Sequence, residues 1–194
     1  MMKIVLSTDN AHKLAEIRSI LAPLGYEVLP KSEVGAGSLE VIEDALDLDG
    51  NAMKKARALH ALTKLAVLAD DTGLFVDALD GEPGVHSARY ASEHDDAANR
   101  EKLLRKLADT PDDKRTAYFE TVLAYIDADG AETVVRGRVD GIITRDERGS
   151  HGFGYDSLFL PQGEEKTFAE MNDDEKNALS HRRRALDALA AFLR

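Results

Sequence analysis

Several short segments of the chain carry residue types that suit chemistry on an anionic substrate. The first, Ser7-Thr8-Asp9-Asn10-Ala11-His12-Lys13, connects an apolar run to an amphipathic stretch, as a strand leading into a helix does. The N–H groups at the start of a helix bind anions, and Lys13 adds a positive charge beside them. The chain contains no G-x-x-x-x-G-K-[ST] phosphate loop. The segment therefore predicts either an anion site or a plain helix cap at Asn10 or Asp9.

Two adjacent acids, Asp70 and Asp71, follow the apolar run from Leu65 to Ala69 directly. In open α/β sheets, ligands gather beyond the carboxyl ends of the strands. With no Lys or Arg nearby in the sequence, two carboxylates at such a place favour a bound cation, and hard oxygen ligands favour Mg²⁺. Neighbouring residues of a strand face opposite sides, so the two acids need not bind the same ion. The alternative is an Asp-rich turn over Asp70-Asp71-Thr72-Gly73.

Three further segments suit the binding of a flat, charged ligand. Gly81 to Tyr90 offers Ser87 and Arg89 in a stretch that by itself indicates only a structured loop. In Gly152-Phe153-Gly154-Tyr155-Asp156, glycines flank a Phe whose ring can lie against a base, and Asp156 can accept a hydrogen bond from the base edge. The alternative there is a loop whose aromatic rings fill the core. The last segment ends in Ser180-His181-Arg182-Arg183-Arg184, where cations in a first helical turn oppose the helix dipole unless an anion is present.

The elements that must position these residues follow from hydrophobic periodicity and turn signals. Strands are expected over Lys3–Thr8, Tyr26–Leu29, Ala66–Ala69, Leu74–Ala78, Arg115–Ile126, Glu132–Ile143 and Ser157–Leu160. Helices are expected from Asn10 to Gly25, from Asn51 to Leu62, from Asp95 to Leu107, as a turn over Asn172–Lys176, and from Ser180 onward with Ala185, Leu189 and Phe192 facing inward. Helices alternate with strands early and a hairpin dominates the middle, which predicts an α/β chain with a mixed sheet.

The composition limits the classes of function. The 194 residues include 25 Lys+Arg and 36 Asp+Glu, for a net charge of −11. This charge argues against a nucleic-acid binder, which needs a basic face, but leaves room for a small anionic ligand in a local basic pocket. The absence of cysteine excludes thiolate nucleophiles, disulfides and zinc ribbons. No apolar run approaches the ~20 residues of a membrane helix. We therefore expect no membrane partner, and we expect the protein to lie in the cytoplasm.

Several motifs stand in a recognisable order: Thr8-x-Asn10-x-x-Lys13, Asp70-Asp71-Thr72-Gly73-Leu74, Pro83-Gly84-Val85-x-Ser87-Ala88-Arg89-Tyr90, Gly152-Phe153-Gly154-Tyr155-Asp156, Ala169-Glu170, Lys176-Asn177 and Ser180-His181-Arg182. In this order and spacing the chain resembles the inosine triphosphate pyrophosphatase family, also called dITP/XTP pyrophosphatases. The resemblance runs from Lys3 to nearly the last residue. It is specific because separate short motifs match rather than one.

The resemblance implies a Mg²⁺-dependent enzyme that hydrolyses ITP, dITP and XTP to the monophosphate and pyrophosphate. Such an enzyme keeps deaminated purines out of DNA and RNA. The implied fold is α/β, an elongated two-lobed domain over residues 1–194 with a long central mixed β-sheet flanked by helices. The implied active site is a cleft between the lobes, and the implied assembly is a homodimer.

The resemblance also implies roles for individual residues. Asp71 matches the general base, which also binds metal, and Glu43 matches the acidic metal ligand. The residues implied to contact substrate are Thr8, Asp9, Asn10, Ala11, His12 and Lys13 in the phosphate-binding turn, Thr72 next to Asp71, Phe153, Gly154, Tyr155 and Asp156 in the base loop, Lys176 at a phosphate, and His181 and Arg182 at the base.

The chain departs from the family pattern at two places. Asp9 stands where many members have Gly, which adds a negative charge beside the phosphate turn. The stretch Val41-Ile42-Glu43-Asp44-Ala45 also diverges, so Asp44 and Asp47 remain alternatives to Glu43 as metal ligands.

Two other functions remain to be compared with the hydrolase. A catalytically silent nucleotide-binding protein on the same scaffold would have lost its acids, and Asp70 and Asp71 are intact. The related Maf-type pyrophosphatases prefer other bases, and the segments 152–156 and 180–182 favour the inosine family.

Overall fold

The computed structural model describes residues 2–93 and 95–193. The chain forms two compact units, each assembled from separate stretches of sequence. Unit 1 comprises Met1–Asp71, Thr121–Gly137 and Arg182–Arg194, and unit 2 comprises Thr72–Glu120 and Arg138–His181. The boundary therefore passes through two segments that the sequence singles out, between residues 71 and 72 and between residues 181 and 182.

The described residues form a sheet of seven strands in the order β2-β1-β3-β5-β6-β7, with β4 paired to β3. The strands are β1 (Met2–Leu6), β2 (Tyr26–Pro30), β3 (Val67–Val76), β4 (Pro83–Gly84), β5 (Thr116–Ile126), β6 (Glu132–Ile143) and β7 (Phe159–Pro161). β1 pairs in parallel with both β2 and β3, whereas β4 pairs antiparallel with β3 and β7 antiparallel with β6. This confirms the predicted α/β fold with a mixed sheet.

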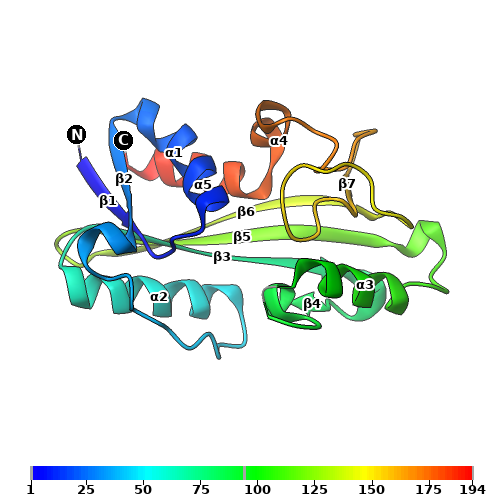
Figure 1. Ribbon diagram of the computed structural model, residues 1–194. Coiled ribbons are helices and arrows are strands. Elements are labelled where there is room, and N and C mark those ends of the chain that lie inside the picture. Colours follow the sequence, from blue (N-terminus) through cyan, green and yellow to red (C-terminus); the bar gives the residue numbers. More distant parts are fainter. Residues whose placement is uncertain (1, 94, 194) are drawn as a thin grey trace. The chain divides into compact units, whose positions relative to one another are not determined.

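The longer helices are α1 (Ala11–Leu21), α2 (Leu48–Thr63), α3 (Asp96–Lys106), α4 (Asp173–Leu179) and α5 (His181–Phe192). In unit 1, α1 and α5 lie on one side of the strands and α2 on the other (Figure 1). Both faces of this part of the sheet are therefore covered. The burial of β5 agrees, because every residue from Thr121 to Ile126 is buried.

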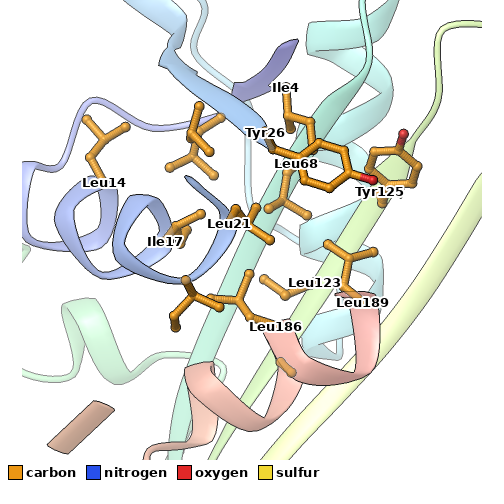
Figure 2. Packing of buried hydrophobic residues seen from close by; sticks show 14 residues of the cluster. Ile4, Leu14, Ile17, Leu21, Tyr26, Leu68, Leu123, Tyr125, Leu186 and Leu189 are labelled. Carbon is orange, nitrogen blue, oxygen red and sulfur yellow. The ribbon is translucent and has the colours of Figure 1, made fainter. Parts of the chain in front are cut away.

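The core of unit 1 joins the two helices of one layer to the sheet beneath them. Ile17 and Leu21 of α1 and Leu186 and Leu189 of α5 are almost fully buried, and they pack on the strands with Leu68 (Figure 2). Ile17, Leu21 and Leu189 are buried at helical spacing, as the periodicity predicts for both helices. This packing fixes the beginning of α1, which carries Lys13, against the strand that carries Asp70.

Unit 2 has a core of its own. It joins Leu103 and Leu107, at the end of α3, to an aromatic group that includes Phe119, Phe159 and Phe168. The unit-2 part of β6 alternates exposed and buried residues, with Arg138, Asp140 and Ile142 exposed and Val139 and Ile143 buried. One face of the sheet is therefore open at this strand.

Three details differ from the sequence-based expectation. β3 is one continuous strand of ten residues, so Asp70-Asp71-Thr72-Gly73 is extended and the interpretation as a turn is wrong. α2 begins at Leu48, three residues early, because Asp47 caps it by accepting from Gly50 N at 2.8 Å. Phe192 is 59% exposed and does not face inward, because it lies at the end of the last helix, beyond the turn that packs on the sheet.

Across residues 2–93 and 95–193, no helix combines the length and apolar composition that crossing a membrane requires.

Candidate active site

The most deeply buried acid of the chain's motifs is Asp70, on β3 in unit 1. Its side chain is 1% exposed, and its Oδ2 lies 2.9 Å from Lys13 Nζ and 3.6 Å from Arg182 Nη2. Arg182 also forms an ion pair with Glu16 of α1. Lys13, Asp70, Arg182 and Glu16 therefore form a chain of alternating charges that joins α1, β3 and α5.

These ion pairs determine the charge state of Asp70. Burial alone raises the pKa of the Asp70 carboxyl, but the positive charges of Lys13, Arg182 and Lys55 outweigh it and hold that pKa well below its usual range. Asp70 is therefore ionised at neutral pH. The sequence offered no cation near this residue, and the tertiary structure supplies three.

The neighbouring acid, Asp71, makes different contacts, because successive residues of a strand face opposite sides. Its Oδ1 lies 3.4 Å from Lys55 Nζ of α2, and Glu43 Oε1 lies 3.1 Å from the same nitrogen. Burial raises the pKa of the Asp71 carboxyl, Lys55 opposes this shift, and the negative charge of Glu43 adds to it. A carboxylate with a raised pKa is the kind of group that accepts a proton in catalysis.

The residues around Asp71 fit a divalent cation. Glu43 and Asp71 place oxygens around one positively charged nitrogen, and Asp71 Oδ2 is buried without a hydrogen-bond partner among the described residues. A buried carboxylate oxygen that lacks a partner is costly, and a hard cation would satisfy it. No group of three or more His, Asp or Glu side chains suited to a metal exists among the described residues. One or two protein carboxylates suffice for Mg²⁺, which keeps several waters or phosphate oxygens.

The three acids of this stretch that the sequence offers as metal ligands make different contacts. Asp44 is exposed and pairs with Lys54, and Asp47 is the cap of α2. Glu43 is the residue of this stretch that shares Lys55 with Asp71. Its loop is anchored by Asn51 of α2, whose fully buried side chain accepts from Ala45 N at 3.0 Å.

The predicted phosphate turn leads into the first turn of α1, and its residues from Asp9 to His12 are exposed. Asn10 caps the helix, because its Oδ1 accepts from His12 N and Lys13 N, and Asn10 N donates to Thr8 Oγ1. The cap interpretation is therefore confirmed, and a bound anion would share the helix start with Asn10. The carboxylate of Asp9 accepts from Ser32 N at 3.1 Å, so it binds the following loop of unit 1.

Unit 2 carries the predicted base loop. Asp156 Oδ2 accepts from Phe153 N and from Lys176 Nζ, both at 2.9 Å, and both of the charged side chains are less than 10% exposed. The ammonium of Lys176 lies 5.1 Å from the centre of the Phe153 ring. One buried ion pair therefore fixes the loop around its aromatic residue, with Phe153 half-buried.

Other residues of the predicted site in unit 2 are in the core or at its edge. Tyr155 is 4% exposed and its hydroxyl donates to Ser87 O, so its side chain supports the loop from inside. Ser87 Oγ accepts from Leu74 N and donates to Gly84 O, which is a structural role. His181 is 4% exposed and packs on the aromatic group of the core, while Thr72 is partly exposed on β3.

Sequence reasoning missed two residues that contact the predicted site. Lys55 falls within the apolar stripe of α2, between the buried Ala52 and Ala56, and a lysine at such a position is a usable signal. Glu16 stands one turn after Lys13 on α1, so both project from the same helix face. Its pairing with Arg182, 166 residues away, has no signal in the sequence.

Comparison with known proteins identifies the family that has this fold and these motifs. The model of the Ham1 family matches residues 4–192. The chain belongs to the Ham1 family. This Ham1-family chain is 46% identical to a dITP/XTP pyrophosphatase of Leuconostoc mesenteroides over 99% of its own length and 96% of the relative's. It is also 46% identical to a dITP/XTP pyrophosphatase of Salmonella paratyphi A over 100% and 99% of the two chains.

A solved HAM1 protein from Coxiella burnetii superposes on this Ham1-family chain with a TM-score of 0.89 at 38% identity, covering 100% of this chain and 98% of that one. The family predicted from the motifs is thereby confirmed.

Replacing Asp70 with Asn should lower the free energy of unfolding by about 3–5 kcal/mol, because the change removes the negative charge from a buried ion-pair network. Urea denaturation measures the effect. Asp49→Asn is the matched control, since Asp49 pairs with Arg136 at the partly exposed surface of the same unit and should contribute less than about 1 kcal/mol. Equal losses for the two variants would contradict the central role of Asp70.

Replacing Gly152 with Ala should disturb the base loop more than the same change at Gly154. Both glycines have positive φ angles, +74° and +60°, so each variant incurs a left-handed penalty of about 1–2 kcal/mol. A Cβ at Gly152 would also lie 2.1 Å from Asp156 Oδ2, whereas nothing lies within 4 Å of one at Gly154. Urea denaturation should give a larger loss for Gly152→Ala, and identical losses would show that Asp156 moves aside freely.

Proposed function

We propose that this Ham1-family protein hydrolyses ITP, dITP and XTP to the nucleoside monophosphate and pyrophosphate. The named relatives support the substrate class, because they match nearly the whole chain. The observation that carries the chemistry is the pair Asp71 and Glu43, two carboxylates that both contact the Lys55 ammonium. Asp71 lies at the end of the parallel part of β3, where ligands bind in open α/β sheets.

We propose that the triphosphate binds where α1 begins. The helix start is exposed, carries no acid in its first turn and has Lys13 beside it. Asp70 holds the Lys13 ammonium at 2.9 Å, so this charge is placed before the substrate arrives. Lys55 adds a second cation next to Asp71, and its pKa is raised, since the nearby acids outweigh its burial. Positioned charges of this kind supply most of the catalysis in phosphoryl transfer.

Asp71 is the proposed general base. It would accept a proton from a water that attacks the α-phosphorus, while pyrophosphate leaves. Its raised pKa favours proton transfer, and its side chain is held next to Lys55. Glu43 and Asp71 would hold Mg²⁺, which would neutralise phosphate charge and lower the pKa of bound water.

The base is proposed to bind in the loop from Phe153 to Asp156, with the half-buried Phe153 ring against its face. His181 and Arg182 are the proposed donors to the 6-oxo group of hypoxanthine or xanthine. Adenine carries an amine at this position, so a buried donor would be left without a partner. Lys176 is predicted to contact a phosphate, and its observed contacts with Asp156 and Phe153 support an additional role in fixing the base loop.

We further propose that the protein is a homodimer that acts in the cytoplasm, where nucleotide precursors are consumed. The open sheet face of unit 2 supports the dimer. There, Phe75 and Tyr118 stack at 4.9 Å beside the oppositely charged Arg138 and Asp140. A patch with an apolar centre and both signs of charge can pair with its own copy across a two-fold axis. Analytical ultracentrifugation of the purified chain measures its mass in solution and so tests whether it is a dimer.

The substrate proposal predicts kcat/KM values for ITP and XTP far above that for ATP, by as much as about 10⁴–10⁵ if the donors are well placed. Release of pyrophosphate from ITP, XTP, GTP and ATP, with Mg²⁺ and with a chelator, measures this. GTP shares the 6-oxo group and tests whether the 2-amino group is rejected separately. Comparable values for ATP and ITP would contradict the proposal.

Replacing Asp71 with Asn should lower kcat by about 10²–10⁴, because the general base is lost, while ITP still binds. Rapid-quench turnover and equilibrium titration of ITP separate the two effects. Asp187→Asn is the control, since Asp187 is a surface acid of α5 paired with Arg183. Wild-type kcat in Asp71→Asn would remove Asp71 from the mechanism.

A further inference from the structure

His181 does not sit in the core of unit 2 as an isolated polar side chain. Its imidazole ring lies 4.7 Å from the ring of Phe119, centre to centre, and the two planes differ by only 19°. Both residues are less than 10% exposed. The contact is thus a parallel stack inside the protein, and the face of the histidine ring is covered by Phe119.

Phe119 is itself held rigidly. It lies on β5, and its ring meets Phe159 edge-on at 4.8 Å and Phe168 at 6.1 Å. Phe168 also approaches His181, at 6.0 Å and a tilt of 51°. Among these contacts the Phe119 stack is the one that is close and nearly parallel, so it constrains the plane of the imidazole most directly.

The plane matters because imidazole N–H bonds lie in it. Rotation of the ring about its bond to Cβ has a broad energy profile, so the side chain alone does not fix the direction of its donors. A flat neighbour against one face removes this rotation without forming a hydrogen bond. With the ring plane restrained, the nitrogens on the ring edge point in one defined direction.

We propose that Phe119 is a positioning residue for base selection, because its ring holds the imidazole of His181 in the plane from which it donates to a 6-oxo purine. The inference rests on the proposed function and deepens it. A donor that can rotate would still bind an oxo group part of the time. Opposite the amine of adenine it could turn away, so the donor would no longer be held there without a hydrogen-bond partner. Loss of the stack should therefore reduce discrimination more than it reduces turnover.

The experiment compares the ratio of kcat/KM for ITP and ATP in variants of the whole chain. Phe119→Leu removes the flat face and should lower the ratio by about tenfold, within the range of coupling between contacting residues. Phe159→Leu is the matched control, because Phe159 belongs to the same aromatic group and packs on Phe119 and Phe168. It should leave the ratio within about twofold of wild type. An equal fall in both variants would mean general loosening of the core and would overturn the proposal.

A double variant separates positioning from structure. In a His181→Gln background, Phe119→Leu should have no further effect on the ratio, since Phe119 acts through the imidazole. A persisting effect would overturn the proposal. If Phe119→Leu does not fold, Phe119→Met serves, because it fills similar space without a flat face.

A spectroscopic readout is independent of activity. Stacking over Phe119 should shift the carbon-bound ring protons of His181 upfield in the NMR spectrum, and Phe119→Met should remove that shift while Phe159→Leu retains it. If the wild-type chain fails to hydrolyse ITP, the proposed function is wrong, and this measurement still decides whether Phe119 orients His181. Unshifted protons in the wild type would refute the orientation itself.

Discussion

The buried carboxylate of Asp70 is the constraint on which the rest of unit 1 depends. Burying a charge is expensive unless cations surround it, and Lys13 and Arg182 approach it from two different helices. The strand cannot keep this acid in the core unless α1 and α5 are both in place. The apolar packing of α1 and α5 and their ion pairs with Asp70 therefore require the same placement of the two helices on the sheet. A lysine proposed to bind phosphate and an arginine proposed to read the base thereby share one anchor.

Because successive residues of a strand face opposite sides, the neighbouring acids Asp70 and Asp71 have different surroundings. Asp70 faces Lys13 and Arg182, and its pKa is held low, while Asp71 faces Lys55 and Glu43, and burial raises its pKa. Asp70 joins the ion pairs of the core, whereas Asp71 is the acid proposed to accept a proton and to hold a cation. Unit 2 uses a similar device at Asp156, where one carboxylate holds both Lys176 and the backbone of the base loop.

The features of the structure that depend on residues close together in the sequence were predictable. The cap at Asn10 and the long hairpin follow from short-range chemistry, and both are observed. The turn over residues 70–73 was wrong because Asp and Gly favour turns locally, whereas strand pairing and ion pairs outweigh that preference here. The opposed dipole at Arg182 indicated a missing anion. Glu16 and Asp70 both form ion pairs with this arginine, so its charge alone is no evidence of a ligand.

The sequence by itself determined the family, the fold class and the short motifs, because each depends on residue types at fixed spacing. Only the tertiary structure decided which charges meet, because ion pairs such as Glu16 with Arg182 join residues far apart in the chain. It placed Glu43 beside the Lys55 that Asp71 also contacts, whereas Asp44 pairs with Lys54 and Asp47 caps α2. It also placed Phe119 under His181, since a stack between a strand and a distant histidine leaves no periodic trace in the sequence.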